Sequence, residues 1–325
     1  MESGSEVDRT VAYPMPFDFL VHADWSIAPG KRWVSVARLI GGRWQVVAPE
    51  RVPPSESFVA QVVAPEAKSD RRLIGFDFPI RVPSKYGTRT GFHDFRELLL
   101  NVGTGAWSDF FNVAGLPEEI SVRRPFYPMR SNNRPKRFHL FDKLEVKGID
   151  ELLRRCDRRT FVRNAACAMF WTLGAQQVGK AAICGWRDVI QPALERGARL
   201  WPFDGSLGDL ARREGSIICE TYPAEAYGHV GVRFGAAESK RRRTHRGAKA
   251  PAVFDWAKTH DVLLSEAASK AISDGFGRLS TGEDAFDSLI GLLGMIEVVS
   301  GRRREGPIDD SLIRLWEGWI LGQSQ

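Results

Sequence analysis

Three apolar runs of this chain end in an acidic residue, and a proline follows each of them closely. The runs end at Asp24, Asp77 and Glu220. A carboxylate at the end of a buried strand is unfavourable unless an opposite charge or a bound cation compensates it. If the three strands share one sheet, their carboxylates will gather at one edge of that sheet.

A second group of acids opens an apolar helical pattern near the C-terminus. Asp284 and Asp287 are three residues apart, so they lie on one face of the predicted helix. Both fall in its first turn, where the helix dipole favours carboxylates. That turn can point at the same sheet edge as the three strand acids.

Carboxylates without a nearby His or Cys cluster favour Mg²⁺ or Mn²⁺. Two such ions about 3.5–4 Å apart activate a water and stabilise the leaving oxygen in phosphodiester hydrolysis. We therefore predict Asp24, Asp77, Glu220 and Asp287 as catalytic metal ligands, with Asp284 as an auxiliary ligand. Any one of these acids could instead be an ordinary turn or capping residue, and it is the recurrence of the pattern that favours a site.

The segments that would position these acids follow an α/β pattern. Strands are predicted at residues 17–28, 33–40, 43–48, 72–78 and 216–220, and helices at 56–67 and 284–299. Gly41 and Gly42 form a two-residue loop between the second and third strands, which indicates a hairpin. We expect an antiparallel meander of three strands, followed by strands that return parallel to the first.

A long segment separates the second acid from the third. Residues 81–214 are predicted to form a mainly helical insertion, with helices at 149–161, 164–175 and 181–194. Residues 1–15 are predicted to be a flexible N-terminal tail. The main domain would then combine residues 16–80 with residues 215–325.

Composition limits the class of protein. The chain has 325 residues, 43% of them hydrophobic, and a formal net charge of +6, which permits an anionic partner. Its four cysteines form no C-x-x-C pair and its six histidines have no metal-ligand spacing, so a zinc site is disfavoured. The start of the chain does not resemble a signal peptide, and the longest apolar run is too short to span a bilayer. We expect a cytoplasmic protein without a membrane partner.

Two basic segments are candidates for binding nucleic acid. One follows the Glu220 strand and contains Lys240, Arg241, Arg242, Arg243 and Arg246. The other, residues 121–137, has no acids. It offers Arg123, Arg124 and Arg130 for phosphates, and Phe126 and Tyr127 for stacking on unpaired bases. Each segment could equally be a solvated charged surface, and Glu225 and Glu283 are also interpreted as solvated.

The order of these strands, acids and the last helix resembles the RNase H-like fold. More narrowly, five short motifs resemble domain-of-unknown-function family 429, a family of predicted nucleases with that fold. They are HADWS at 22–26, GFDFP at 75–79, WPFDG at 201–205, ETYPAEAY at 220–227 and EDAFDSL at 283–289. The resemblance implies that Asp24, Asp77 and Glu220 are the acids of the first, fourth and fifth strands, and Asp287 the helix acid. The 81–214 insertion departs from a minimal RNase H and leaves the substrate open.

The sequence thus favours a metal-dependent nuclease that acts on DNA or RNA. One alternative is a non-catalytic nucleic-acid-binding or assembly protein with the same fold. A third alternative is an ATP-dependent phosphotransferase similar to the sugar-kinase and actin superfamily, which shares this sheet. It is less favoured because that superfamily requires two such domains and only one meander is visible in this sequence.

Overall fold

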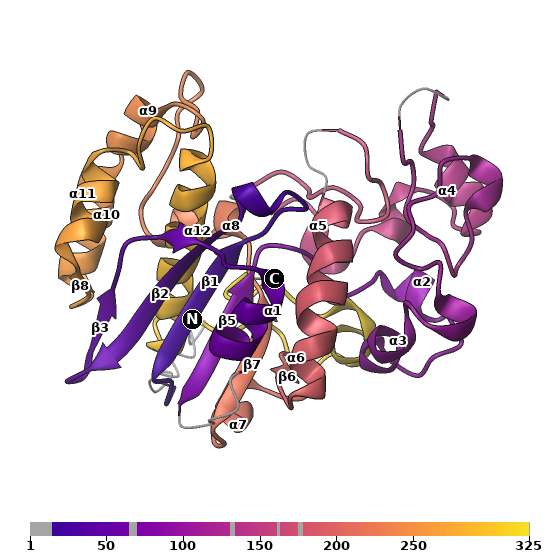
Figure 1. Cartoon of the computed structure of the whole chain (residues 1–325), viewed down its shortest axis with the longest axis horizontal. Coiled ribbons are helices and arrows are strands. Elements are labelled where there is room, and N and C mark those ends of the chain that lie inside the picture. The colour runs from indigo at the N-terminus through magenta and orange to yellow at the C-terminus, as the bar shows by residue number, and fades with distance from the viewer. Residues whose placement is uncertain (1–14, 65–69, 131–133, 161–162, 175–177, 325) are drawn as a thin grey trace, which may run out of the picture.

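The computed structural model describes residues 15–64, 70–130, 134–160, 163–174 and 178–324. Residues 1–14, which make up nearly all of the predicted flexible tail, lie outside the described residues. Within the described residues, the structure is a mixed α/β fold built on one sheet (Figure 1).

The five predicted strands form the centre of this sheet. They are β1 (Phe19–Asp24), β2 (Trp33–Ile40), β3 (Arg43–Val46), β5 (Arg71–Phe76) and β7 (Gly215–Glu220). Their spatial order is β3-β2-β1-β5-β7. β2 is antiparallel to both β1 and β3, whereas β5 runs parallel to β1 and β7 parallel to β5. The predicted antiparallel meander with parallel returning strands is therefore confirmed.

The sheet has eight strands rather than the predicted five. The additional strands are β4 (Glu50–Arg51), β6 (Arg199–Leu200) and β8 (Leu263–Leu264), which pair with β2, β7 and β3. Each is only two residues long, too short to produce an alternating hydrophobic pattern in the sequence. β6 and β8 lie at the two ends of the strand order and do not alter the central arrangement.

Helices cover both faces of the sheet (Figure 1). Val21 and Ala23 of β1 belong to a core with one set of helices: α1 (Ser55–Phe58), α5 (Val178–Gly185) and α6 (Gln191–Glu195). Leu20 faces the opposite way, into a core formed with α8 (Pro223–His229), α10 (Ala250–Thr259) and α12 (Gly282–Val299). This alternation along β1 is what a strand buried on both faces requires.

The remaining helices are short and lie away from the centre of the sheet. They are α2 (Ser84–Gly87), α3 (Phe95–Asn101), α4 (Phe138–Lys143), α7 (Leu207–Leu210), α9 (Arg243–Gly247) and α11 (Glu266–Ser273). In Figure 1, α9 and α11 lie at one end of the molecule with α10, and α2, α3 and α4 lie at the other.

Helix α12 is tightly packed on β1 and β2. The Ser288 hydroxyl lies 2.8 Å from that of Ser35 and donates to the carbonyl of His22 at 3.2 Å. At Gly291 the helix approaches so closely that a Cβ atom would overlap the His22 ring. The contacts of Ser288 and Gly291 fix the rotation of α12 about its axis and its position along the strands. They thereby fix the position of Asp287, which is next to Ser288 in the sequence.

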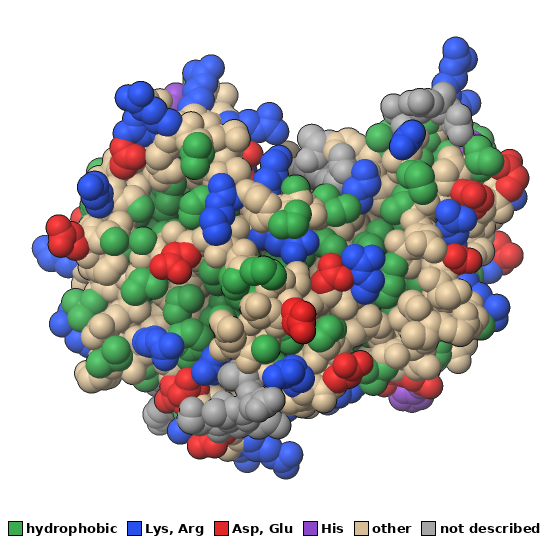
Figure 2. Space-filling view, viewed as in Figure 1, with side chains coloured by type: hydrophobic (Ala, Val, Ile, Leu, Met, Phe, Trp, Pro, Cys, Tyr) green, Lys and Arg blue, Asp and Glu red, His purple; other side chains and the backbone are tan. Residues whose placement is uncertain are grey.

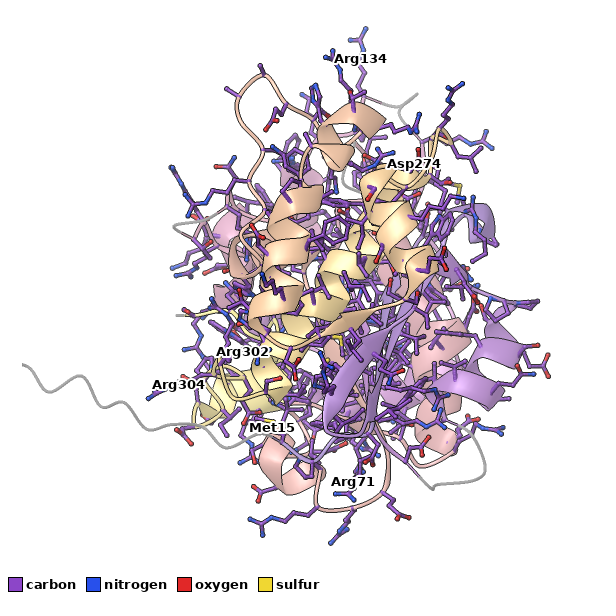
Figure 3. All side chains as sticks on the ribbon, turned by 90° about the vertical axis from the view of Figure 1, so that its left-hand side faces the viewer. Met15, Arg71, Arg134, Asp274, Arg302 and Arg304 are labelled. Atoms are coloured by element: carbon purple, nitrogen blue, oxygen red, sulfur yellow. The ribbon has the colours of Figure 1, made fainter. Side chains whose placement is uncertain are left out.

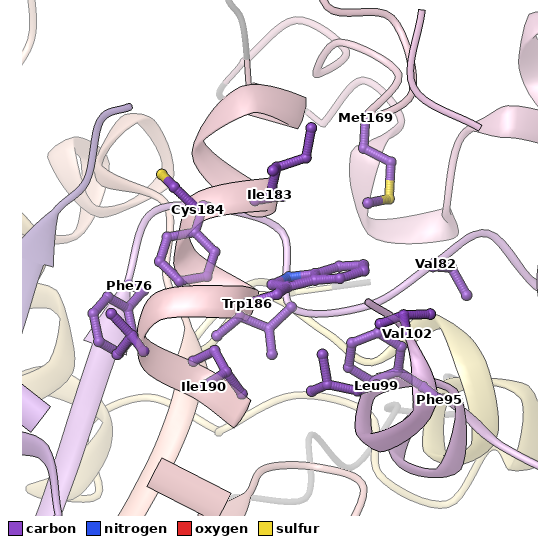
Figure 4. Close-up of a cluster of buried hydrophobic side chains, with 14 of the residues drawn as sticks. Phe76, Val82, Phe95, Leu99, Val102, Met169, Ile183, Cys184, Trp186 and Ile190 are labelled. Atoms are coloured by element: carbon purple, nitrogen blue, oxygen red, sulfur yellow. The ribbon is translucent and has the colours of Figure 1, made fainter. Parts of the chain in front are cut away.

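The 81–214 segment shares a core with the sheet. Trp186 packs between Ile183 and the α3 side chains Phe95 and Leu99 (Figure 4), and the same core includes Phe76 of β5. Its indole nitrogen donates to the carbonyl of Pro79 at 2.6 Å. The insertion therefore holds the loop that directly follows Asp77.

Helix prediction in this segment is correct in one place and wrong in two. Residues 178–195 are helical, with a wide π turn at Trp186–Ile190 just before Pro192, which tolerates the missing N–H of proline. The predicted helix at 149–161 consists of two short 3₁₀ turns, Ile149–Leu152 and Arg155–Asp157. The described part of 164–175 contains no helix.

No helix in the described part of the chain is long and apolar enough to cross a membrane. On the face seen in Figure 2, Lys and Arg side chains are scattered among acidic ones and do not gather into one patch.

Candidate functional site

Asp24 and Asp77 come together where β1 and β5 end. The strands are parallel and paired from Phe19 with Arg72 to Ala23 with Phe76, so the residues that follow lie side by side. Met15 and Arg71, which precede or begin these two strands, lie at the lower end of the molecule in Figure 3. The two aspartates are therefore at the far, carboxyl end of the strands, as the sequence predicts.

Contacts made by Trp25 hold the Asp77 carboxylate in place. The Trp25 backbone N–H donates to Asp77 Oδ1 at 2.7 Å. The Trp25 ring packs edge-on against Phe76, with ring centres 5.7 Å apart, and Arg32 lies 4.2 Å over the Trp25 ring. These contacts fix the Asp77 carboxylate in a position facing the end of β1.

The N-terminal part of α12 brings two more carboxylates to this place, although only Asp284 lies in the first turn, because the helix begins at Gly282, two residues before the predicted start. Asp287 is buried and is held by two partners, because the Tyr227 hydroxyl donates to its Oδ1 and the Lys240 ammonium to its Oδ2. Asp284 is half-buried one turn earlier. We call Asp24, Asp77, Asp284 and Asp287 the aspartate cluster.

Three carboxyl groups of the aspartate cluster, those of Asp24, Asp77 and Asp284, have raised pKa values. Burial, followed by the charges of Asp77 and Asp287, raises the pKa of Asp24 well above its usual range. Burial and the charge of Asp287 raise the pKa of Asp77 to about 7, although the Trp25 N–H opposes this. Burial, Glu283 and Asp287 raise the pKa of Asp284 to about 6. Each acid disfavours the charge of its neighbours, so the ionised cluster would lack sufficient compensating charge from the protein.

Lys240 offsets part of that charge. Partial burial opposes its positive charge, but the carboxylates of Asp287 and Asp24 outweigh burial and raise the pKa of Lys240 above its usual range. The side chain is 41% exposed, and its ammonium is paired with Asp287 at the wall of the cavity. The cluster still has four carboxylates for one paired ammonium.

Glu220 lies at the same sheet edge in a different environment. Arg81 forms a buried ion pair with its Oε1 at 2.5 Å and Arg154 with its Oε2 at 2.9 Å, while the Ile80 N–H donates to Oε2 at 2.8 Å. Arg154 also pairs with buried Asp157. We call Glu220, Asp157, Arg81 and Arg154 the Glu220 cluster.

Charges in the Glu220 cluster balance, with two carboxylates and two guanidinium groups. Burial alone would raise the pKa of Asp157, but the Arg154 guanidinium outweighs burial and lowers it. Both Glu220 oxygens are engaged, so in this structure the residue stabilises the buried arginines. Its predicted role as a metal ligand stays a prediction.

A cavity of about 330 Å³ joins the two clusters. Its walls include Asp77, Asp287 and Lys240 from one side and Glu220 and Arg154 from the other. A second hollow, of about 380 Å³, lies beyond Asp77 and is lined by Lys31 and Lys180 among others. The aspartate cluster thus borders space that a ligand can enter, with positive charges on both sides.

Comparisons of the chain with protein-family models, with curated proteins and with solved structures found no match. The resemblance to domain-of-unknown-function family 429 therefore stays a prediction, and function must be inferred from the site.

A divalent cation fits the donor chemistry of the aspartate cluster. Among the residues that the structure describes, no three His, Cys, Asp or Glu side chains are already arranged to hold a metal ion. The donors are nevertheless hard carboxylate oxygens that repel one another, and a cation would relieve that repulsion. Asp24 and Asp77 are the residues that would hold it, with Asp284 and Asp287 beside them.

The basic segment after β7 divides into paired, buried and exposed residues. Lys240 pairs with Asp287, and Arg243 pairs with Asp274. Arg246 is 2% exposed and donates to the carbonyls of Gly275 and Lys240, so its guanidinium holds the surrounding loops together. Among the predicted nucleic-acid-binding residues of this segment, Arg241 and Arg242 are the two that are exposed on the surface.

The other basic segment lies away from the aspartate cluster, beside α4 (Figure 1). Arg124 donates to the carbonyls of Asn112 and Val113, whereas Arg123 and Arg130 are exposed. The prediction that Phe126 and Tyr127 are available for stacking is wrong, because both are fully buried in the core.

Several residues of the site were missed in the sequence. Tyr227 was not singled out, and Glu225, interpreted as solvated, is buried and ion-paired with Arg163 at 3.0 Å. Arg154 belongs to an arginine-rich run at residues 154–159. This run could have indicated a buried cation, but it lies in a predicted helix that the structure does not contain. Arg81 is an isolated arginine, and nothing in the sequence marks it as the partner of Glu220.

Proposed function

We propose that this protein is a metal-dependent nuclease with an RNase H-like fold, hydrolysing phosphodiester bonds of a nucleic acid at the aspartate cluster. One observation carries the proposal: Asp24 and Asp77 at the sheet edge lie beside Asp284 and Asp287 of α12, and the mutual repulsion of these acids leaves negative charge for a cation to compensate. The strand order β3-β2-β1-β5-β7 and the pattern of parallel and antiparallel pairing support the fold assignment.

Each residue has a role that follows from its contacts. Asp24 and Asp77 hold Mg²⁺ or Mn²⁺, and the Trp25 N–H keeps the Asp77 carboxylate oriented. Tyr227 orients Asp287 through its hydroxyl. The positive charge of Lys240, which lines the cavity, attracts a substrate phosphate there. When bound, the cation supplies Lewis-acid activation of water and stabilises the leaving oxygen.

The test is a cleavage assay on single-stranded and duplex DNA and RNA, with Mg²⁺ or Mn²⁺ and with EDTA. We expect cleavage of at least one substrate, its loss in EDTA, and a rate reduced about 100-fold or more in Asp24→Asn. Asp255→Asn is the matched control, because Asp255 is exposed on α10. Cleavage that survives Asp24→Asn would show that the site is assigned wrongly.

A second candidate is a nucleic-acid-binding protein that does not catalyse hydrolysis. The observation that favours it is the Lys240 ammonium, which already pairs with Asp287 as a fixed cation. In that case nucleic acid would bind equally well in EDTA and in the Asp24→Asn variant, and no substrate would be cut under any metal condition.

A further inference from the structure

A large cleft lies next to the cavity of the aspartate cluster. Its volume is about 980 Å³, and it shares Ala224 and Tyr227 with that cavity as lining residues. Its walls are formed by α8, the segment before α9, the loop after α12, and Arg163 together with residues of the 155–160 stretch. Arg303, which lies in the sequence between the Arg302 and Arg304 labelled in Figure 3, also lines the cleft. The cleft and the cavity are thus neighbouring parts of one concave surface.

The cleft is strongly basic. Six arginines line it, together with one acidic residue, Glu225. They are Arg155, Arg158, Arg159, Arg163, Arg233 and Arg303. A concave surface with one sign of charge concentrates ligands of the opposite sign.

Only part of this positive charge is neutralised. Arg155 pairs with Asp310 and Glu317, and Arg163 with Glu225. Within the residues that the structure describes, the exposed side chains of Arg158, Arg159 and Arg233 have no hydrogen-bond or ion-pair partner. Three guanidinium groups are therefore available, and their planar donors suit phosphate oxygens.

Arg303 adds a cation deeper in the wall. Its Nη1 donates to the Gly322 carbonyl at 3.3 Å, whereas its buried Nε has no partner among the described residues. The neighbouring imidazole stays neutral, because burial and the charge of Arg303 lower the pKa of His229 to about 4. The excess positive charge therefore extends from the rim to the floor of the cleft.

The lining of the cleft indicates a single strand. Tyr227 and Phe234, both half-buried, offer aromatic surface in the cleft, with their ring centres 5.8 Å apart. Arginines interleaved with aromatic rings are typical of surfaces that bind unpaired nucleotides.

Tyr227 connects the cleft to the candidate catalytic residues. Its ring lines the cleft, while its hydroxyl donates to Asp287. A strand lying along the arginines would thus pass within reach of the aspartate cluster and of the Lys240 ammonium.

We propose that this cleft binds single-stranded nucleic acid, with Arg158, Arg159 and Arg233 contacting its phosphates, and leads the strand to the aspartate cluster. The delivery of the strand rests on the proposed nuclease function, whereas binding in the cleft does not require it.

The test measures binding without catalysis. Fluorescence anisotropy in EDTA reports the affinity of labelled single-stranded oligonucleotides for the full chain and for the variant Arg158→Gln/Arg159→Gln/Arg233→Gln. We expect at least a tenfold loss of affinity. We also expect the plot of log K against log [salt] to become less steep, with the magnitude of its slope smaller by about 2, since three phosphate contacts are removed.

The matched control is Arg38→Gln/Arg212→Gln/Arg213→Gln, which removes three exposed arginines that line neither the cleft nor the cavity. It changes the net charge equally, and we expect its affinity to stay within about twofold of the wild type. Equal losses in both variants would show that binding follows net charge, and an unchanged affinity of the cleft variant would exclude the cleft. Duplex DNA or polyglutamate competing as well as the single strand would also overturn the proposal.

Cleavage assays on the same variants separate the two proposals. If the wild type binds through the cleft but cuts nothing with Mg²⁺ or Mn²⁺, the nuclease proposal fails and the cleft proposal stands. If the cleft variant cuts as fast as the wild type at subsaturating substrate, the cleft proposal fails alone.

Discussion

The aspartate cluster and the Glu220 cluster lie at the same edge of one sheet, border the same cavity, and differ in how their charge is balanced. In the Glu220 cluster two carboxylates face two buried guanidinium groups. In the aspartate cluster four carboxylates face one paired ammonium, and the pKa values of Asp24, Asp77 and Asp284 are raised. An acid at the end of a strand is therefore not by itself a sign of a site. The difference lies in whether the protein supplies the compensating charge or leaves room for a ligand to do so.

The largest expected difference concerns stability. Replacing Glu220 by Gln leaves Arg81 and Arg154 buried with one carboxylate fewer, so we expect Glu220→Gln to lower the free energy of unfolding by about 3–5 kcal/mol. Asp24→Asn removes one of several repelling charges, and we expect it to leave the metal-free protein as stable as the wild type or more so. Urea unfolding in EDTA at pH 7.5 measures both. A larger loss in Asp24→Asn than in Glu220→Gln would reverse the assignment of the two clusters.

The second largest expected difference concerns how the stability of the metal-free protein depends on pH, because the aspartate cluster contains an acid with a raised pKa. The pKa of Asp77 is about 7 in the folded protein, above its ordinary value of 3.8, so the native state binds more protons than the unfolded state between these values. Stability of the metal-free protein should therefore fall as pH rises from about 4 to 7, because the slope follows the protons bound by the unfolded state minus those bound by the native state.

Asp77→Asn keeps the acceptor for the Trp25 N–H but removes this titration. We expect the variant to gain about 1–3 kcal/mol relative to the wild type between pH 4.5 and pH 8. Thermal unfolding in EDTA across this range provides the measurement, with Asp255→Asn as the control. Parallel profiles for the wild type and Asp77→Asn would mean that Asp77 carries no uncompensated charge.

The smallest expected effect concerns Lys240. Because its ammonium already occupies Asp287 and repels an incoming cation, we expect Lys240→Met to tighten Mn²⁺ binding about threefold to tenfold. Isothermal titration calorimetry measures this change, and Lys258→Met on the exposed side of α10 is the control. Weaker Mn²⁺ binding in Lys240→Met would instead assign Lys240 a role in organising the cluster.

The sequence predicted the parts of the molecule that repeat a local pattern. The central strands are short apolar runs bounded by turn residues, α12 is a longer apolar segment, and their positions follow from these patterns. Asp24 and Asp77 stand at the ends of two strands and Asp287 near the start of α12, so the edge on which they meet could also be predicted.

The predictions that were wrong or incomplete concern features that depend on contacts between residues distant in the sequence. Nothing local to Glu220 reveals that Arg81 and Arg154, 139 and 66 residues away, would enclose it (220 − 81 and 220 − 154). Residues 149–161 have helical spacing, but Asp157 accepts from the Arg154 backbone N–H at 3.1 Å and closes a tight turn instead. Phe126 and Tyr127 stand in a basic, proline-rich segment, and only the packing of the insertion buries them.

The most direct test of the account is a crystal structure of the protein grown with saturating Mn²⁺, with anomalous scattering used to locate the ion. We expect an anomalous peak between the carboxylates of Asp24 and Asp77, and no such peak in Asp24→Asn crystals grown under the same conditions. An empty aspartate cluster in the wild type, with Lys240 still on Asp287, would contradict the proposal that these four aspartates form a metal site.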